Sequence, residues 1–203
     1  MTKNYIFDFG KVLVDFEPDF MTKQYIAAPS DIKLASDVIF DRLYWDKLDE
    51  GTITDDEVKE GIRSRLPERL KESAVAVYDN WYRHLPEIEG MRSLLMRIKE
   101  EGCGLYLLSN ISKGFAENYS KVKSINELFS LFDGLVFSGP IGLVKPTPEI
   151  FNHLLSKYGL KPQECTFVDD NAANIEGAKA VGINTFLFSG NYLDLQKEIF
   201  SDG

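Results

Sequence analysis

From residue 86 onward, short apolar runs alternate with amphipathic helical patterns, and this alternation limits the folds open to the chain. A similar apolar run, Tyr5–Phe7, stands near the amino terminus. Strands that alternate with helices form βαβ units, so the sequence predicts an α/β fold built on a doubly wound parallel sheet. The remaining predicted strands lie at 105–108, 135–137, 166–168 and 184–188.

Residues 16–85 differ from the rest, because their pattern is helical with little sign of strands. Ser30 or Asp31 is expected to cap one helix, and Thr54–Glu57 has the form of a capping box that begins another. We interpret this segment as a helical bundle inserted after the first strand. The predicted division is therefore a core of residues 1–15 and 86–203 and an inserted helical cap of residues 16–85.

The composition is that of an ordinary globular protein, with 44% hydrophobic and 27% charged residues in 203. The net charge of −9 argues against nucleic acid and against an anionic membrane as partners. It does not exclude an anionic small substrate, because a metal ion inverts the charge of a site. The chain opens directly into its first strand and has no apolar run of membrane-spanning length, so a cytoplasmic location is expected. Cys103 and Cys165 lack metal or disulfide spacing, and both are expected to be buried and reduced.

Polar residues follow four of the five predicted strands. In a parallel sheet the carboxyl ends of the strands share one edge, and open α/β sheets bind their ligands there. Alone, Asp8 followed by Gly10 could simply end a strand and cap a turn. Four such ends on one edge instead predict a functional site, with contributions from Asp8, Ser109–Asn110, Ser138–Gly139 and Asp169–Asp170.

Three acids of this edge, Asp8, Asp169 and Asp170, would repel each other strongly unless a cation lies between them. Carboxylate oxygens with room for water and substrate phosphate suit Mg²⁺. The alternative, a helix N-cap with an acid near the helix start, accounts for only one member of the Asp169–Asp170 pair. The sequence therefore predicts a magnesium site.

An anion site is expected beside the acids. Ser109 and Asn110 offer a hydroxyl, an amide and backbone N–H groups next to a helix start. Lys145 lies in the segment Gly142–Pro146, where a proline and a following helix start restrict where its ammonium points. A lone lysine is usually a solvated surface group, but this setting favours a functional one.

Four ordered segments resemble the motifs of the haloacid dehalogenase-like hydrolase superfamily. They read D-F-G-K-V-L-V-D from Asp8, L-L-S-N from Leu107, G-L-V-K-P from Gly142 and V-D-D-N-A-A-N-I-E-G-A from Val168. The helical insertion resembles the cap of a subfamily that contains many sugar-phosphate phosphatases. The first and fourth segments are most similar to bacterial α-glucose-1-phosphatase-like members. The resemblance implies a Rossmann-like core with a helical cap and a Mg²⁺-dependent phosphatase acting on small phosphorylated metabolites, sugar phosphates first.

The resemblance also implies a role for each site residue. Asp8 would be the nucleophile that forms an aspartyl-phosphate, and Lys145 would neutralise it and the transferring group. Ser109 and Asn110, together with Lys145, would bind phosphate oxygens. The implied magnesium site consists of the Asp8 carboxylate, the Gly10 backbone carbonyl, a direct ligand from Asp170, and Asp169 holding metal-bound water.

The chain departs from the superfamily pattern at Gly10, where phosphatases usually carry an aspartate that acts as general acid and base. Lys11 is expected to point away from Asp8 in an extended segment. Without an acid at residue 10, substrates with good leaving groups, such as sugar-1-phosphates, are favoured. Two alternatives remain: a 2-haloacid dehalogenase, which also lacks this aspartate but needs no Mg²⁺, and a catalytically weak phosphate-binding protein. For substrate recognition, Tyr44, Trp45 and the loop from Leu48 to Ile53 are candidates, with ordinary packing as the alternative.

Overall fold

The structure is a computed structural model that describes residues 2–200. Its centre is a sheet of five parallel strands in the order β3-β2-β1-β4-β5, which confirms the predicted α/β fold with a doubly wound sheet. The first strand therefore lies in the middle, where both faces are buried. The strands are β1 (Asn4–Phe7), β2 (Gly104–Ser109), β3 (Gly134–Phe137), β4 (Cys165–Asp169) and β5 (Asn184–Leu187).

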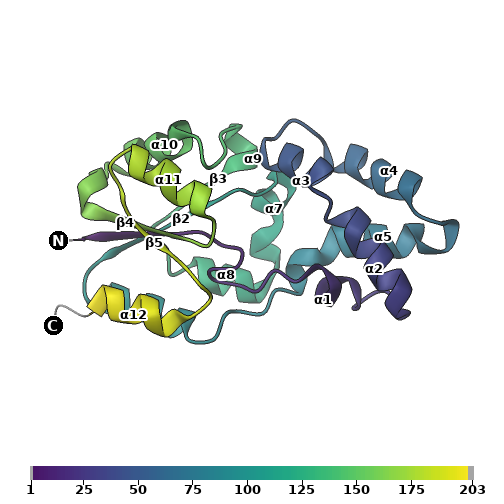
Figure 1. Ribbon diagram of the computed structural model, residues 1–203, viewed down its shortest axis with the longest axis horizontal. Coiled ribbons are helices and arrows are strands. Elements are labelled where there is room, and N and C mark those ends of the chain that lie inside the picture. Colours follow the sequence, from purple (N-terminus) through teal and green to yellow (C-terminus); the bar gives the residue numbers. More distant parts are fainter. Residues whose placement is uncertain (1, 201–203) are drawn as a thin grey trace.

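Helices cover both faces of the sheet (Figure 1). Alternate residues of β1 point to opposite faces: Phe7 joins one apolar cluster and Ile6 joins the other. The cluster around Phe7 includes residues of α6 (Met91–Glu100), α8 (Lys123–Phe129) and α12 (Tyr192–Phe200). The cluster around Ile6 includes residues of α10 (Pro148–Tyr158) and α11 (Ala172–Ala180).

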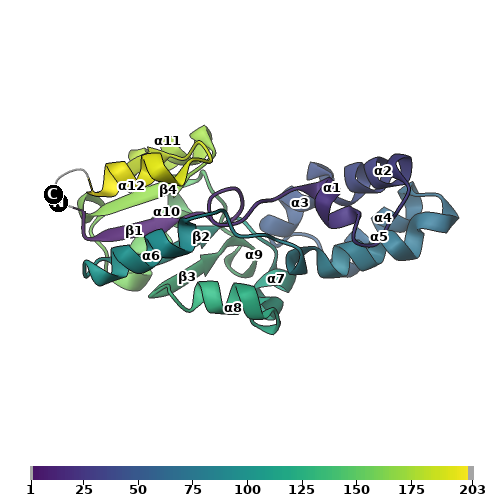
Figure 2. The ribbon, with the colours of Figure 1, turned by 90° about the horizontal axis from the view of Figure 1, so that it is seen from below.

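The helical insertion lies beyond the carboxyl ends of the strands (Figures 1 and 2). It packs around an apolar cluster of its own, which contains Ile39, Leu48, Val58, Ile62 and Val77. This separate cluster supports the proposed division into core and cap. The helices of the insertion are α1 (Pro18–Thr22), α2 (Pro29–Ile39), α3 (Arg42–Asp49), α4 (Asp55–Arg65) and α5 (Glu68–Asn80).

Short elements connect the two parts. Between the sheet and the insertion lie α7 (Lys113–Asn118) and the single turn α9 (Ser138–Ile141) (Figures 1 and 2). Helix α3 contacts α9, so the insertion touches the core next to the end of β3. Three 3₁₀ turns complete the described chain: η1 (Trp81–Arg83), η2 (Tyr119–Lys121) and η3 (Pro162–Glu164).

The predicted capping box is confirmed, because Thr54 and Glu57 form reciprocal hydrogen bonds at the start of α4. The side chains of Ser112 and Asn171 also cap helices, by accepting hydrogen bonds from backbone N–H groups. The predicted cap at Ser30 or Asp31 is wrong. Helix α2 begins at Pro29 instead, because the proline ring fixes a helical φ at the first position and has no N–H to satisfy.

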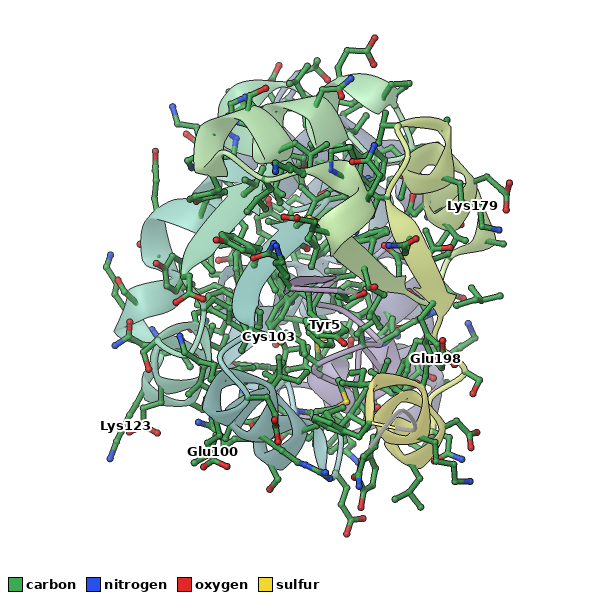
Figure 3. The ribbon with its side chains drawn as sticks, turned by 90° about the vertical axis from the view of Figure 1, so that its left-hand side faces the viewer. Tyr5, Glu100, Cys103, Lys123, Lys179 and Glu198 are labelled. Carbon is green, nitrogen blue, oxygen red and sulfur yellow. The ribbon has the colours of Figure 1, made fainter. Side chains whose placement is uncertain are left out.

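The cysteine prediction is correct for Cys165, which is buried and free, and wrong in part for Cys103, which is only half-buried. Cys103 follows α6 at the end of the molecule where the strands begin, and Figure 3 views the molecule from that end, with Tyr5 and Cys103 labelled. This end lies away from the carboxyl ends of the strands. Within residues 2–200, no helix combines the length and apolar character needed to cross a membrane.

Candidate active site

The sheet register brings the polar strand ends together. Phe7 pairs with Leu107 of β2 and with Val168 of β4, all in parallel. Asp8, the residue directly after β1, donates its N–H to the Val168 carbonyl at 2.9 Å. Asp8 therefore emerges between the ends of the two neighbouring strands, as the sequence predicted.

Lys145 forms ion pairs with two of the acids. Its ammonium lies 2.8 Å from a carboxylate oxygen of Asp8 and 2.8 Å from one of Asp169, and only 1% of its side chain is exposed. A buried ammonium is stable only when carboxylates and hydrogen bonds compensate for its lost hydration. The solvated alternative for Lys145 is therefore excluded.

The electrostatics of this triad favour charge on Lys145. Burial alone would lower the pKa of Lys145, but the adjacent carboxylates of Asp8 and Asp169 outweigh it and raise that pKa. Burial raises the pKa of Asp8 to about 6, against the lowering effect of the Lys145 charge. Asp8 is thus mostly ionised at neutral pH, as a nucleophile must be.

Asp169 is fully buried and saturated with hydrogen bonds. Beyond its ion pair with Lys145, it accepts bonds from the Asn171 N–H at 2.8 Å and from the Asn174 amide at 3.0 and 3.1 Å. Asn174 was missed by sequence reasoning. Its signal was present, because a polar residue in the first turns of α11 directly after Asp169 can turn back toward the strand end.

The three acids form a group with the spacing of a metal site. One carboxylate oxygen from each of Asp8, Asp169 and Asp170 lies within 4.8 Å of the other two. Burial, followed by the charge of Asp169, raises the pKa of Asp170, whereas the charges of Lys11 and Lys145 lower it. Because Asp169 already has its partners, Asp8 and Asp170 are the carboxylates with capacity to bind a cation. Such an oxygen donor set fits Mg²⁺.

The amide of Asn110 holds the backbone of Lys145. Its Nδ2 donates to the Lys145 carbonyl at 2.9 Å, and its Oδ1 accepts from the Lys145 N–H at 2.8 Å. This pair of bonds positions Lys145, so the predicted phosphate contact of the Asn110 side chain would compete with them. The hydroxyl of Ser109 lines the cavity and has no hydrogen-bond partner recorded among residues 2–200.

A cavity of about 590 Å³ opens over these groups. Its floor includes six of the predicted site residues, whereas Asp169 lies beneath it. Its roof comes from the insertion and the segments that join it to the core, where aromatic rings contact one another with centroids 5.1–5.7 Å apart. The floor residues are Asp8, Gly10, Ser109, Asn110, Lys145 and Asp170, and the aromatic roof residues are Phe16, Phe40, Trp45 and Trp81.

Two of the recognition candidates in the insertion are separated by the structure. Trp45 lines the cavity, whereas the ring of Tyr44 packs against Gly61 within the insertion. The predicted loop from Leu48 to Ile53 begins two residues too early, because Leu48 and Asp49 are the last residues of α3. Leu48 is buried in the insertion, and Asp49 faces the cavity.

The turn after Asp8 differs from the expected extended segment. Lys11 has a φ of 60°, because a tight turn places its N–H 2.7 Å from the Val14 carbonyl. Lys11 consequently lines the cavity rather than pointing away from it. Gly10 has an ordinary φ, and an added Cβ there would meet no atom within 4 Å.

The family pattern described as "haloacid dehalogenase-like hydrolase" matches residues 2–182 of this chain. That span contains every residue of the site described above. The chain belongs to this family. It is an enzyme of the hydrolase class, and the four segments that suggested the resemblance all contribute to one site.

Named phosphatases are among its relatives. The chain is 30% identical to D-ribitol-5-phosphate phosphatase of Bacteroides thetaiotaomicron, over 92% of this chain and 91% of that protein. It is 32% identical to glyceraldehyde 3-phosphate phosphatase of Pyrococcus furiosus, over 67% of this chain and 57% of that protein.

Solved structures share the fold. An enzyme of the family from Bacteroides thetaiotaomicron, solved in complex with magnesium and inorganic phosphate, superposes with a TM-score of 0.72 over 96% of this chain and 99% of that chain, at 23% identity. The L-2-haloacid dehalogenase of Xanthobacter autotrophicus superposes with a TM-score of 0.67 over 98% of this chain and 88% of that chain, at 17% identity. A family enzyme that binds magnesium and phosphate and a dehalogenase thus share this architecture, so the fold alone does not choose between the two activities.

Proposed function

We propose that this protein is a Mg²⁺-dependent phosphatase that hydrolyses small phosphorylated metabolites through an aspartyl-phosphate on Asp8. The observation that carries the proposal is the arrangement at the cavity floor. A carboxylate at the end of the central strand lies beside a second acid, Asp170, and its charge is balanced on one side by the buried Lys145.

The chain's own residues account for the main requirements of phosphoryl transfer, which are positioning and neutralisation of charge. Asp8 attacks phosphorus and the bond to the leaving oxygen breaks. Lys145 stays charged beside Asp8 and faces the negative charge of the transferring group. Ser109 offers a hydroxyl to a phosphate oxygen, and Asn110 holds Lys145 in place.

Mg²⁺ fits the acids of the cavity floor. Asp8 and Asp170 would hold it directly together with the Gly10 carbonyl, and Asp169 would act through water from beneath. When bound, the cation would neutralise phosphate oxygens and offset the two net negative charges left by three carboxylates and one ammonium. That excess of acid is the physical argument for a metal.

The proposed substrates are sugar phosphates, consistent with the phosphorylated sugar compounds named for two relatives. A cavity of about 590 Å³ with an aromatic roof is large enough for such a metabolite. Residue 10 has no acid, so we propose a preference for sugar-1-phosphates, whose anomeric oxygen leaves more readily than a primary alkoxide, unless another group of the cavity supplies the proton. Such metabolites are found in the cytoplasm, which is the proposed location.

A 2-haloacid dehalogenase is the rival activity, with Asp8 attacking carbon instead of phosphorus. Halide displacement needs no cation, so it leaves the acid at Asp170 without a purpose. Chloride release from 2-chloropropionate in the presence of a chelator would support the rival.

The deciding experiment uses Asp8→Asn with p-nitrophenyl phosphate under saturating Mg²⁺. The amide has nearly the same volume but is a poor nucleophile, so turnover should fall at least 10³-fold while the melting temperature is kept. Asp15→Asn is the matched control, because Asp15 lies seven residues farther on, outside the wall of this cavity, and should keep full activity. Substantial activity in Asp8→Asn would contradict the nucleophile, and tight phosphate binding without turnover in the wild type would indicate a binding protein.

A further inference from the structure

A phosphatase that acts on sugar phosphates needs a proton for the leaving oxygen, because an alkoxide is a poor leaving group. Under the proposed function, Asp8 is the nucleophile and cannot supply that proton. Gly10, next but one along the chain, has no side chain to do so. The donor must be another titratable group on the cavity wall.

Most titratable groups on that wall are already engaged. Lys145 is held by two carboxylates, which raise its pKa and make it a poor acid. Asp170 belongs to the proposed metal site. Asp46 forms an ion pair with Arg42 at 2.8 Å on the outer part of α3.

Asp49 is different. It is the last residue of α3, it faces the cavity from the side opposite Asp8, and its carboxyl has no hydrogen bond or ion pair recorded within residues 2–200. Burial and then the charge of Asp46 raise the pKa of Asp49 to about 7; Asp8 also raises it, whereas Lys145 and Arg42 lower it. A carboxyl of this kind carries a proton for part of the time at neutral pH.

The position of Asp49 is fixed by the core. Gly51, two residues later, has a φ of +68°, and a Cβ added to it would lie 2.4 Å from the carbonyl oxygen of Gly139 in α9. A Cβ added to Gly142 would lie 3.8 Å from the Glu50 carbonyl. The end of α3 thus rests directly on the backbone of the core, which aligns Asp49 with the carboxyl ends of the strands.

We propose that Asp49 is the general acid and base of this enzyme, supplied by the helical insertion in place of an acid at residue 10. In the first step Asp8 bonds to phosphorus, the bond from phosphorus to the leaving oxygen breaks, and the Asp49 proton passes to that oxygen. In the second step water attacks phosphorus, the Asp8–phosphorus bond breaks, and Asp49 takes a proton from the water. Both carboxyl groups return to their starting states, and the products are an alcohol and hydrogen phosphate.

The test compares leaving groups in Asp49→Asn, measured with glucose-6-phosphate and p-nitrophenyl phosphate under Mg²⁺. An aryl oxide leaves without a proton, so kcat/KM for the aryl ester should change less than threefold. For the sugar ester it should fall by about 10²-fold or more. In the wild type, the rate on the sugar ester should also decrease as the pH rises through about 7, and Asp49→Asn should lose this decrease.

Two further variants keep the test decisive. In the Asp49→Asn background, Gly10→Asp should raise kcat/KM for the sugar ester at least tenfold, because an added Cβ at residue 10 meets no atom within 4 Å. Glu50→Gln, at the exposed neighbouring position, should behave as the wild type. Equal losses on both esters, or the selective loss appearing in Lys11→Met instead, would overturn the role of Asp49. Absence of aryl phosphate turnover in the wild type would overturn the proposed function itself, and the role of Asp49 with it.

Discussion

At the scale of single residues, the site contains both buried groups with charged partners and a carboxyl group that has no partner among the described residues. Lys145 has two carboxylate partners, Asp8 and Asp169, and is almost fully buried. Asp49 faces the same cavity with no recorded partner in the described part of the chain. The proposed roles account for the difference, because a nucleophile must be ionised and a proton donor must be protonated at the same pH.

The raised pKa of Asp49 has a measurable effect on stability. An aspartate with a folded-state pKa near 7 and an unfolded value of about 3.9 binds more protons when folded, so its contribution to stability falls as the pH rises from about 4 to 7. Asp49→Asn removes this loss. In metal-free buffer at pH 8 the free energy of unfolding of the variant should exceed that of the wild type by roughly 1–2 kcal/mol, after allowing for solvent in the cavity. Urea unfolding at pH 8 and pH 4 measures this difference, and an equal gain at both pH values would contradict the raised pKa.

Replacement of Lys145 tests the buried ion pairs. Lys145→Met leaves Asp8 and Asp169 close together without a cation, which should cost about 3–5 kcal/mol and abolish turnover. Adding Asp169→Asn removes one of the stranded charges and keeps its volume. The double variant should therefore recover part of the stability but none of the activity. If thermal denaturation shows the double variant to be less stable than Lys145→Met, the two residues are not coupled through their charges.

At the scale of elements, the sheet edge was predictable and the roof of the cavity was not. Asp8 follows β1, Ser109 ends β2 and Asp169 ends β4, and parallel register alone brings such positions together. Asp49 follows no such rule. It lies in a short helix of mixed pattern, and its place depends on how the insertion rests on α9, a contact between distant segments that no local pattern encodes.

A helix start is predictable where a side chain makes the cap, as at Thr54 and Asn171. The prediction failed at Pro29, where the restricted backbone of the proline starts the helix without a capping side chain. The dual bonds from Asn110 to the Lys145 backbone were also beyond prediction, because they join loops 35 residues apart. The sequence therefore predicted which strand ends come together, but it did not predict Asn174 or which groups hold others in place.

The contact of α3 with the core can be tested with two glycines. Gly51→Ala brings a methyl group to 2.4 Å from the Gly139 carbonyl at a φ of +68°, so the end of α3 must move. Gly159→Ala is the matched control, because its φ of +64° imposes similar backbone strain with no atom within 4 Å. Both should lose about 1 kcal/mol from strain. Only Gly51→Ala should also lower kcat/KM for glucose-6-phosphate, by tenfold or more, and equal kinetics in the two variants would show that this contact does not position the site.

At the scale of the whole molecule, the acidic cavity floor links metal binding to folding. The chain carries a net charge of −9, and part of this excess is concentrated in the site, where Asp8, Asp169 and Asp170 outnumber Lys145. Asp8 follows β1, Asp169 ends β4 and Asp170 follows it, so these acids lie close together only in the folded chain. Because the unfolded chain offers no such site, a cation that binds here must stabilise the fold.

Mg²⁺ should therefore raise the melting temperature. Binding stabilises by RT ln(1 + [L]/Kd), which is about 2.7 kcal/mol at one hundred times Kd, or roughly 5–10 °C for a chain of this length.

Asp170→Ala should remove most of this shift, because Asp170 lacks the hydrogen bonds that occupy Asp169. Asp169→Ala should lower the melting temperature without Mg²⁺, since it removes one of the two carboxylate partners of Lys145, yet keep more of the shift. Asp15→Asn serves as the control with a full shift. The metal site would be refuted if the chelator-treated protein remained fully active and melted at the same temperature with and without Mg²⁺. The nucleophilic role of Asp8 would still be decided separately, by Asp8→Asn.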